Sequence, residues 1–254
     1  MSLRAKLRAG ETTFGSWITL GHVAIAEIMA KAGFDWVVVD LEHSVIGVER
    51  AGDMIRVIDL CGTAPLVRLT SHDADQIKRV MDAGAHGIIV PMVKTAEEAR
   101  WAVAATRYAP VGTRGAGLGR AQGYGVDFHR YSDWLTDGPV VIVQIEHVDA
   151  IDHLDDILAV PGVDGFIIGP YDLSCSLGLS GQFEAPAFVA AMTRIREAGT
   201  RRGCVAGLHI VEPDLNQLDR TLAEGYNFIA YSVDIRMLDV AVRQGLARAR
   251  KTER

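Results

Sequence analysis

The sequence contains little cysteine and no long apolar run. Cys61, Cys175 and Cys204 are an odd number of thiols without Cys-x-x-Cys spacing, which excludes a disulfide framework and a thiolate zinc site. No apolar stretch reaches about 18 residues, so no membrane-spanning helix is expected. The N-terminal segment MSLRAKLRAGE lacks the apolar core of a signal peptide. We therefore expect a cytoplasmic protein with reduced thiols and no membrane partner.

Clusters of positive charge, linkers and nucleotide-binding glycines are also missing. The formal net charge is -6, and no lysine- or arginine-rich patch precedes the last few residues, which argues against a nucleic-acid partner. No Pro/Ser-rich linker divides the 254 residues, so one domain over residues 1–254 is expected. No Gly-x-Gly-x-x-Gly follows the first expected strand, which weakens a dinucleotide-binding fold.

What the chain does contain is a recurrent unit: a helical stretch, a glycine, a polar residue and a short apolar run. Glycine fits the end of a helix, and the apolar run fits a strand that is buried on both faces. The unequal spacing argues against a solenoid with a fixed period. The unit recurs at Gly33-Phe34-Asp35, Gly84-Ala85-His86, Gly162-Val163-Asp164 and Gly225-Tyr226-Asn227.

Eight short strands are expected to alternate with amphipathic segments such as Asp73–Met81 and Ala96–Thr106. This alternation predicts an α/β fold, a single-domain (β/α)8 TIM barrel with an extra C-terminal helix. A doubly wound open sheet is the main alternative. The expected strands are Phe14–Thr19, Trp36–Asp40, Ala64–Arg68, Gly87–Val90, Val140–Ile145, Gly165–Ile168, Val205–Leu208 and Phe228–Tyr231.

Two carboxylates follow neighbouring expected strands at the end where barrel enzymes carry their active sites. Glu146 and Asp172 suit Mg²⁺ or Mn²⁺, which favour oxygen ligands. Asp172 could instead cap the helix that follows it. Gln144 and Glu146 share one side of the pleat, so both should face the barrel interior. We interpret the pair Glu146 and Asp172 as a metal site.

Two basic side chains complete this end of the barrel. His43 comes three residues after Asp40, and a nearby carboxylate fixes the tautomer of an imidazole and raises its basicity, as a general base needs. A histidine in a loop is more often a surface residue. Arg68 closes its strand and could bind an oxyanion or form a salt bridge in the barrel mouth. No lysine ends an expected strand, which disfavours chemistry through a lysine Schiff base.

Residues 112–120 form a glycine-rich segment that carries Arg114 and Arg120. Such a segment could cradle an anion or act as a flexible lid over the site. It does not match a Walker sequence. We expect a long functional loop after the fourth strand, without a specific contact.

Taken together, these motifs resemble the HpcH/HpaI aldolase family, the metal-dependent (class II) pyruvate aldolases, over nearly the whole chain. The segments that carry the resemblance are Gly15-Ser16-Trp17, Gly33-Phe34-Asp35-Trp36, Asp40-Leu41-Glu42-His43, Val67-Arg68, Val90-Pro91-Met92-Val93, Gly112-Thr113-Arg114-Gly115, Gln144-Ile145-Glu146 and Gly169-Pro170-Tyr171-Asp172-Leu173-Ser174.

The resemblance implies reversible cleavage of 4-hydroxy-2-oxo acids to an aldehyde and pyruvate, or a pyruvate analogue such as hydroxypyruvate. The cofactor would be Mg²⁺, Mn²⁺ or Co²⁺, and it would stabilise an enolate. The partners would be the small-molecule 2-oxo acid and aldehyde, and further copies of the chain in a homohexamer built as a trimer of dimers. Two alternatives remain: a related lyase for citryl- or malyl-CoA thioesters, and a non-catalytic sugar-acid or phosphate-binding barrel.

The resemblance also implies a catalytic group. Glu146 and Asp172 would hold the metal, His43 would be the base, and Arg68 would steady the enolate. Asp82 would raise the basicity of the histidine. Because Asp82 falls near the end of an expected helix, on the face opposite the active site, a neighbouring subunit would have to present it, unless the helix boundary is misplaced. Asp40 completes the expected catalytic group.

The substrate pocket follows in the same way. His209 stands where the best-known members carry an aliphatic residue, and it would either border the aldehyde pocket or pack against its loop. Gln144 and the backbone at Tyr171 would contact the keto acid. The further residues expected to contact the substrate are Trp17, Gly169, Pro170 and Asp172.

Overall fold

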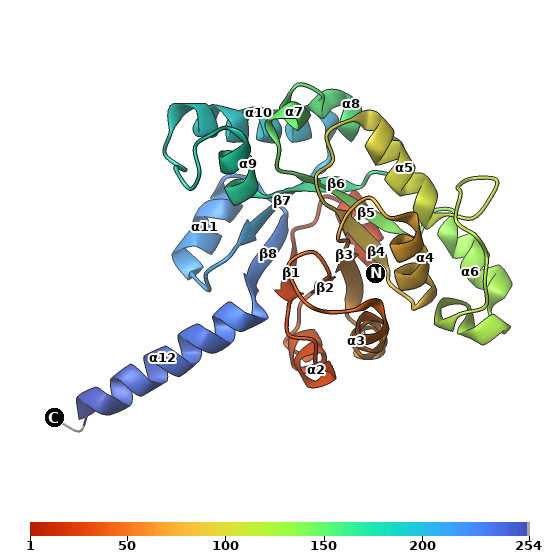
Figure 1. Ribbon diagram of the computed structural model, residues 1–254, viewed down its shortest axis with the longest axis horizontal. Helices are drawn as coiled ribbons and strands as arrows, with labels where there is room; N and C mark the ends of the chain where they lie inside the picture. The colour runs from red at the N-terminus through yellow and green to blue at the C-terminus, as the bar shows by residue number, and fades with distance from the viewer. Residues whose placement is uncertain (253–254) are drawn as a thin grey trace.

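The computed structural model describes residues 1–252 and is a closed barrel of eight parallel strands (Figure 1). The strands follow one another in chain order, and β8 pairs with β1 to close the barrel. The expected TIM barrel is therefore confirmed, and residues 253–254 of the expected domain lie outside the described residues. The strands are β1 (Thr13–Ile18), β2 (Trp36–Asp40), β3 (Ala64–Arg68), β4 (Gly87–Val90), β5 (Val140–Ile145), β6 (Gly165–Ile168), β7 (Val205–Ile210) and β8 (Phe228–Val233).

Helices connect successive strands and surround the barrel (Figure 1). They are α1 (Leu3–Arg8), α2 (Val23–Lys31), α3 (Val48–Leu60), α4 (Ala74–Asp82), α5 (Ala96–Thr106), α6 (Phe128–Leu135), α7 (Val148–Ile151), α8 (Leu154–Leu158), α9 (Pro170–Ser176), α10 (Pro186–Arg202), α11 (Leu215–Ala223) and α12 (Asp234–Thr252), with a short 3-10 segment, η1 (Arg120–Gly125), between α5 and α6.

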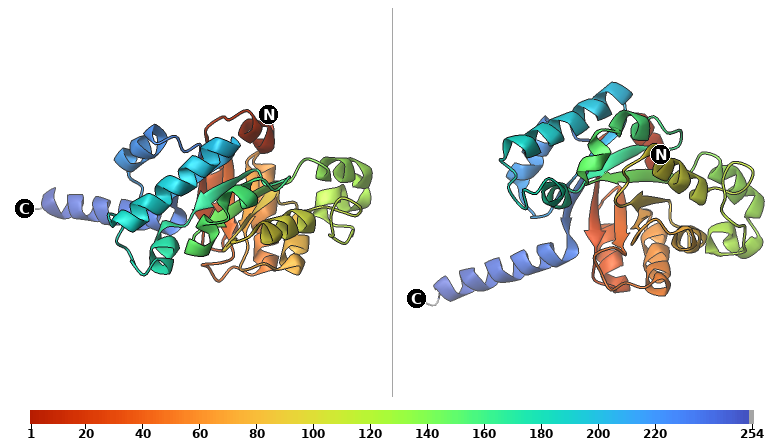
Figure 2. Two further views of the ribbon diagram at one scale, coloured as in Figure 1. Left: turned by 90° about the horizontal axis from the view of Figure 1, so that it is seen from above. Right: turned by 45° about the horizontal axis from the view of Figure 1, so that its top comes forward.

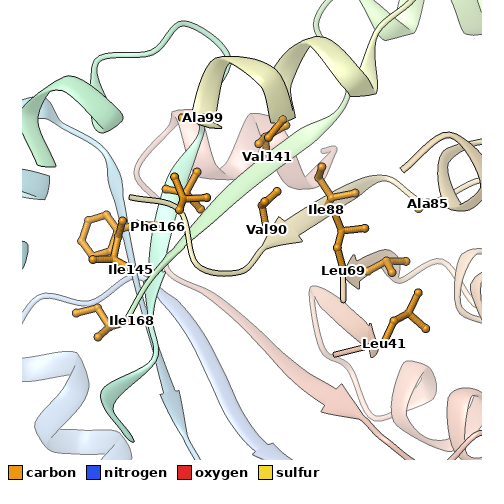
Figure 3. Packing of buried hydrophobic residues seen from close by; sticks show 14 of the residues in the cluster. Leu41, Leu69, Ala85, Ile88, Val90, Ala99, Val141, Ile145, Phe166 and Ile168 are labelled. Atoms are coloured by element: carbon orange, nitrogen blue, oxygen red, sulfur yellow. The ribbon is translucent and has the colours of Figure 1, made fainter. Parts of the chain in front are cut away.

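The strands are almost wholly apolar because both of their faces are buried. One set of side chains fills the barrel; within it, the rings of Trp36 and Phe228 stack with their centroids 4.0 Å apart. The other set packs the strands against the helices, and Figure 3 shows Val90, Val141 and Ala99 in this outer layer. Since side chains alternate along a strand, each strand sends every second residue into the barrel.

The same alternation brings polar residues to the carboxyl ends of the strands. On β2, Asp40 follows the interior residues Trp36 and Val38, and its register partner on β3 is Arg68. On β7, His209 pairs in register with the interior Ala230 of β8. The barrel mouth is therefore lined with polar side chains above an apolar interior.

Helix α12 extends away from the barrel instead of packing along the outside of β8 and β1 (Figures 1 and 2). It carries a row of exposed apolar side chains, Ile235, Leu238, Val242 and Leu246. Their spacing of three and four residues places them along one side of the helix. Across residues 1–252, no helix is both long and apolar enough to cross a bilayer.

Candidate active site

Glu146 directly follows β5 and is buried in the barrel mouth, with 2% of its surface exposed. Its Oε1 accepts a hydrogen bond from the backbone N–H of Met92 at 2.7 Å, and its Oε2 accepts one from Nε2 of Gln144. The two side chains thus share the interior face, as expected from their spacing. Burial raises the pKa of Glu146 to about 7, although both hydrogen bonds oppose this shift.

Gly169, at the end of β6, leaves room for this carboxylate. A Cβ atom at Gly169 would lie 2.6 Å from Oε2 of Glu146, which is closer than real side chains approach. Helix α9 begins at the next residue, Pro170, so the chain turns immediately beside the buried carboxylate. Glycine is therefore required at position 169 because the Glu146 carboxylate lies too close for any side chain, and not because the backbone has an unusual conformation.

Asp172 lies in the first turn of α9 and is exposed, as is Tyr171. The residue that caps this helix is Gly169, so Asp172 does not have the capping role that was its alternative. The negative charge of Asp172 contributes to the raised pKa of Glu146. Residues 1–252 contain no group of three or more His, Cys, Asp and Glu side chains arranged to bind a metal directly. Any cation here would be held by two carboxylates together with smaller ligands.

Arg68 and Asp40 form a two-point ion pair across β3 and β2. Nε of Arg68 donates to Oδ1 of Asp40 at 2.8 Å, and Nη2 donates to Oδ2 at 2.6 Å. The guanidinium also lies over the indole of Trp17, 4.4 Å from its centroid. Burial acts to lower the pKa of Arg68, but Asp40, Glu42 and Glu146 outweigh it and raise the pKa. The cation is therefore fixed in orientation and fully charged.

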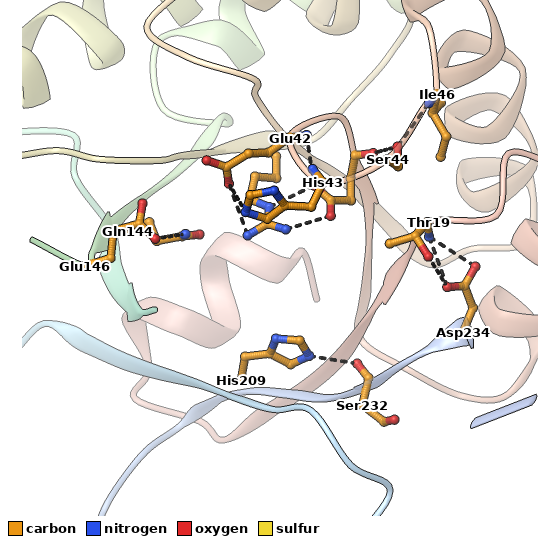
Figure 4. A network of polar contacts seen from close by, with 12 residues as sticks. Thr19, Glu42, His43, Ser44, Ile46, Gln144, Glu146, His209, Ser232 and Asp234 are labelled. Atoms are coloured by element: carbon orange, nitrogen blue, oxygen red, sulfur yellow. Dashed lines mark hydrogen bonds and ion pairs between the residues drawn. The ribbon is translucent and has the colours of Figure 1, made fainter. Parts of the chain in front are cut away.

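Glu42 is a site residue that the sequence interpretation missed. Oε2 of this carboxylate is 3.2 Å from Nη1 of Arg68, and it is buried without a hydrogen-bond partner. Burial raises the pKa of Glu42 to about 7; the charge of Arg68 opposes the shift, while Asp40 and Asp172 reinforce it. Its position just after the end of β2 was the signal, because residues that follow a barrel strand at its carboxyl end border the mouth. Figure 4 shows Glu42 facing Gln144 and Glu146.

The structure corrects the expected partner of His43. The Asp40 carboxylate accepts hydrogen bonds from the Arg68 guanidinium and, at 3.0 Å, from the backbone N–H of Glu42. It therefore binds the arginine and the loop after β2 instead of the imidazole. The acid near the imidazole is Glu42, whose Oε2 lies 3.8 Å from Nε2 of His43. The His43 side chain is 63% exposed and lies at the rim, where a second molecule can reach it.

Asp82 lies at the other end of the barrel from the rim. It is the last residue of α4, which runs back toward the start of β4, and the same chain does not bring it near His43. Its Oδ1 is buried without a hydrogen-bond partner, 3.6 Å from Nη2 of Arg114. Burial raises the pKa of Asp82.

The glycine-rich segment 112–120 is not a lid over this chain's own site. It follows α5 rather than β4 directly, and a Cβ at Gly119 would lie 2.8 Å from the carbonyl oxygen of Asp82. Arg114 is buried and donates to Oη of Tyr131 at 2.8 Å, so it is not available to cradle an anion. Of the two possibilities raised for this segment, the contacts of Arg114 and Gly119 support neither an anion cradle nor a lid at the chain's own rim, and the functional role of the loop stays a prediction.

His209 and Trp17 close the mouth on the side of β7, β8 and β1. Their rings are 5.4 Å apart, and Nε2 of His209 lies 3.2 Å from the carbonyl oxygen of Ser232. Burial lowers the pKa of His209 to about 4. The indole Nε1 of Trp17 is buried without a hydrogen-bond partner. Of the two alternatives for His209, the structure favours a position facing the mouth over packing against a loop.

Comparisons with known proteins identify the family. The model of the HpcH/HpaI aldolase/citrate lyase family matches residues 13–240. The hydroxypyruvate/pyruvate aldolase of Roseobacter denitrificans is 38% identical over 239 residues, covering 93% of this chain and 92% of that protein. The 2-keto-3-deoxy-L-rhamnonate aldolase of Escherichia coli is 38% identical over 250 residues, covering 96% and 91% of the two chains.

A solved structure from Burkholderia cenocepacia, an HpcH/HpaI aldolase/citrate lyase family protein, superposes with a TM-score of 0.92 at 34% identity. The match covers 98% of this chain and 99% of that one. Sequence and fold thus agree with the resemblance drawn from the motifs. The chain belongs to the HpcH/HpaI aldolase/citrate lyase family and is an enzyme of the aldolase, or carbon–carbon lyase, class.

Proposed function

We propose that the chain is a class II aldolase that reversibly cleaves 4-hydroxy-2-oxo acids to an aldehyde and pyruvate or hydroxypyruvate. The observation that carries this proposal is the buried carboxylate of Glu146, whose pKa is about 7 in a mouth that also contains Glu42 and Asp172. Burial is the largest cause of this raised pKa and the charges of Glu42 and Asp172 add to it, and a bound divalent cation would offset both effects. Oε2 of Glu42 forms an ion pair with Arg68 but is buried without a hydrogen bond.

The residues of this mouth fit a divalent cation such as Mg²⁺, Mn²⁺ or Co²⁺. Glu146 and Asp172 would be the direct ligands, since two carboxylates together with small oxygen ligands are a usual set for Mg²⁺. When bound, the cation would supply Lewis-acid stabilisation of negative charge on the substrate oxygens. Glu146 must lose its proton to bind, and the cation would favour this loss.

Arg68 and His43 have complementary roles in the proposed cleavage. The base, His43, takes the proton of the 4-hydroxyl group, acting through a water molecule. The C3–C4 bond then breaks, its electron pair enters the enolate of the 2-oxo acid, and the aldehyde leaves. Arg68 stabilises the developing oxyanion, and the enolate takes up a proton at C3 to give the free 2-oxo acid. Asp40 keeps the guanidinium in place for this role.

The keto acid would lie between β5 and α9. Gln144, fixed by its hydrogen bond to Glu146, faces the interior and can donate to a substrate oxygen. Gly169, Pro170 and Tyr171 carry the chain past the rim, where the backbone N–H of Tyr171 can receive the substrate carboxylate. The whole chain acts in this proposal as one catalytic domain.

Asp82 completes the site only if a second copy of the chain presents it. The partner's Asp82 would then reach the exposed imidazole of His43 and raise its basicity, while segment 112–120 of the partner would border the rim. A homohexamer built from dimers would supply this arrangement. The exposed apolar row on α12 supports assembly, since a helix that leaves its own barrel has that row available for a second copy.

The test is a substrate panel with an independent readout for each rival mechanism. Lactate dehydrogenase and NADH report pyruvate and hydroxypyruvate released from 4-hydroxy-2-oxo acids with different aldehyde halves. A thiol reagent reports coenzyme A released from citryl- and malyl-CoA, and borohydride with pyruvate traps any Schiff base. We expect 2-oxo acid release from at least one hydroxy-oxo acid, no thiol release and no borohydride inactivation. Exclusive cleavage of the thioesters would contradict the proposal.

A further inference from the structure

Ser232, near the end of β8, has a left-handed backbone conformation with φ 55°, which residues other than glycine rarely adopt. Its hydroxyl donates to the carbonyl of Val211 at 3.0 Å, and its carbonyl accepts from Oγ of Ser16 at 3.2 Å. The register of β1 against β8 shifts between Gly15 and Trp17, next to this point. A strained residue held by several hydrogen bonds is typical of functional sites.

The carbonyl group of Ser232 determines which tautomer His209 adopts. Because a carbonyl oxygen only accepts hydrogen bonds, its contact with Nε2 requires the proton to be on Nε2. Burial lowers the pKa of the ring to about 4, with Arg68 acting in the same direction and the Ser232 contact and Asp40 opposing it. At neutral pH the ring is therefore neutral, and Nδ1 keeps a lone pair that can accept a hydrogen bond.

The neighbours of His209 connect it to the reacting part of the site. The indole of Trp17 is close to both His209 and Arg68, with its ring centroid 5.4 Å from that of the imidazole and 4.4 Å from the guanidinium carbon. Trp17 is 2% exposed, and its Nε1–H has no hydrogen-bond partner. A buried donor without a partner is unfavourable, so this part of the mouth is suited to a polar ligand group.

We infer that His209 and Trp17 form a hydroxyl-recognition wall, at which Nδ1 of His209 accepts a hydrogen bond from a substrate hydroxyl next to the reacting carbons. A hydroxyl group can donate to this acceptor and also accept from an N–H, whereas a hydrogen atom or methyl group can do neither. This inference rests on the proposed aldolase function and specifies its substrate class. The hydroxyl belongs either to the 2-oxo acid, as in hydroxypyruvate, or to the aldehyde, as in glycolaldehyde.

The experiment measures aldol addition with four substrate pairs: pyruvate or hydroxypyruvate, each with acetaldehyde or glycolaldehyde. The wild type is compared with His209→Leu, which lacks an acceptor, and His209→Asn, whose Oδ1 can replace Nδ1. His129→Leu, a change at an exposed histidine on α6, is the matched control. The measured quantity is the ratio of kcat/KM for the hydroxylated substrate to kcat/KM for its deoxy counterpart.

We expect the wild type to favour hydroxylated substrates in one of the two halves by about tenfold, as one hydrogen bond to a buried acceptor supplies. His209→Leu should bring that ratio close to one, and His209→Asn should largely restore it. A loss confined to the hydroxypyruvate comparison assigns the hydroxyl to the 2-oxo acid, and a loss confined to the glycolaldehyde comparison assigns it to the aldehyde; both support the inference.

Two results would overturn the inference while leaving the aldolase function intact. One is a wild type that does not distinguish hydroxylated from deoxy substrates in either half, a measurement that needs no variant to fold. The other is a His209→Leu protein with all four rates reduced by the same factor. Absence of activity with all four pairs in the wild type would instead contradict the proposed function and the inference together.

Discussion

Arg68 and Asp40 meet across β3 and β2 through two hydrogen bonds of 2.8 and 2.6 Å, and Asp40 is 1% exposed. This pair sets the direction of the Arg68 guanidinium in the barrel mouth. A bidentate pair restrains Arg68 better than a single contact could, because the planar fork has one matching orientation. The residue proposed to stabilise the enolate is thus oriented before substrate arrives.

Replacing Arg68 with lysine should lower kcat about 100-fold with a smaller change in KM, because the charge remains while the fixed fork is lost. Asp40→Asn should lower kcat and also destabilise the fold, since it leaves a largely buried guanidinium without its counter-ion. Steady-state kinetics and thermal unfolding measure the two effects. Full activity in Arg68→Lys would show that the orientation of this cation is unimportant.

The raised pKa values of Glu146 and Glu42 predict how stability depends on pH without a cation. Each carboxyl binds its proton more tightly in the folded protein, at about 7, than in the unfolded chain, where the value is near 4.5. Their contribution to stability is therefore complete below pH 4.5 and is lost as pH rises through 7. In chelator, Tm should fall by about 5 °C between pH 5 and pH 8 relative to Glu146→Gln.

A cation that binds the deprotonated carboxylates should reverse this loss. Adding Mg²⁺ or Mn²⁺ should raise Tm more at pH 8 than at pH 5, and the increase should be absent in Glu146→Gln. Glu11→Gln, which removes an exposed carboxyl from the turn before β1, is the control and should behave as the wild type does. An equal cation-induced shift in Glu146→Gln would count against Glu146 as a ligand.

Site sharing through Asp82 predicts that two inactive variants can restore each other. In a mixed assembly, an Asp82→Asn subunit keeps its own Glu146 and can receive Asp82 from a Glu146→Gln subunit. Unfolding and refolding a 1:1 mixture should then recover about a quarter of wild-type activity, because half of the dimers are mixed and each has one complete site. If the activity of the mixture does not exceed the sum of the activities of the two separate variants, Asp82 does not act in the site of a neighbouring subunit.

The exposed apolar row on α12 predicts that copies of the chain assemble through this helix, and that a charged residue placed in the row dissociates them. Leu238→Glu should lower the mass measured by light scattering, because it places a carboxylate in the middle of a row that is proposed to pack on a second copy. Arg243→Glu, an exposed change on the same helix, is the control for charge alone. A wild type with the mass of one chain would contradict the assembly directly.

Most of the barrel could be predicted from the sequence because its strands are buried on both faces and therefore appear as apolar runs. Apart from β1, which is shifted by one residue, the errors fall where polar residues continue a strand. The expected strands stopped at Leu208 and Tyr231, whereas β7 and β8 continue through His209 and Ser232. His209 and Ser232 are polar residues of the barrel mouth. The apolar pattern that predicts a strand therefore stops at the residues that line the site.

Most side chains of the candidate site were named from the sequence, with Glu42 as the exception, but the partner of Asp40 was not predicted. Asp40 was expected to support His43, and it binds Arg68 instead, because strand register decides which side chains meet and a single sequence does not contain it. The arginines of segment 112–120 suggested an anion cradle because the sequence does not show whether a side chain is buried. In the structure Arg114 lies 4.5 Å from the ring of Tyr108 and is buried.

The most direct test of the account is cation-dependent release of a 2-oxo acid by the wild type and by Glu146→Gln. Protein stripped with chelator is supplied with a cleavable 4-hydroxy-2-oxo acid, lactate dehydrogenase and NADH, and then titrated with Mg²⁺ or Mn²⁺. We predict no release before the titration, saturable recovery in the wild type and in Glu11→Gln, and a rate at least 100-fold lower in Glu146→Gln at every cation concentration. Release that persists in chelator, or recovery in Glu146→Gln equal to that of the wild type, would contradict it.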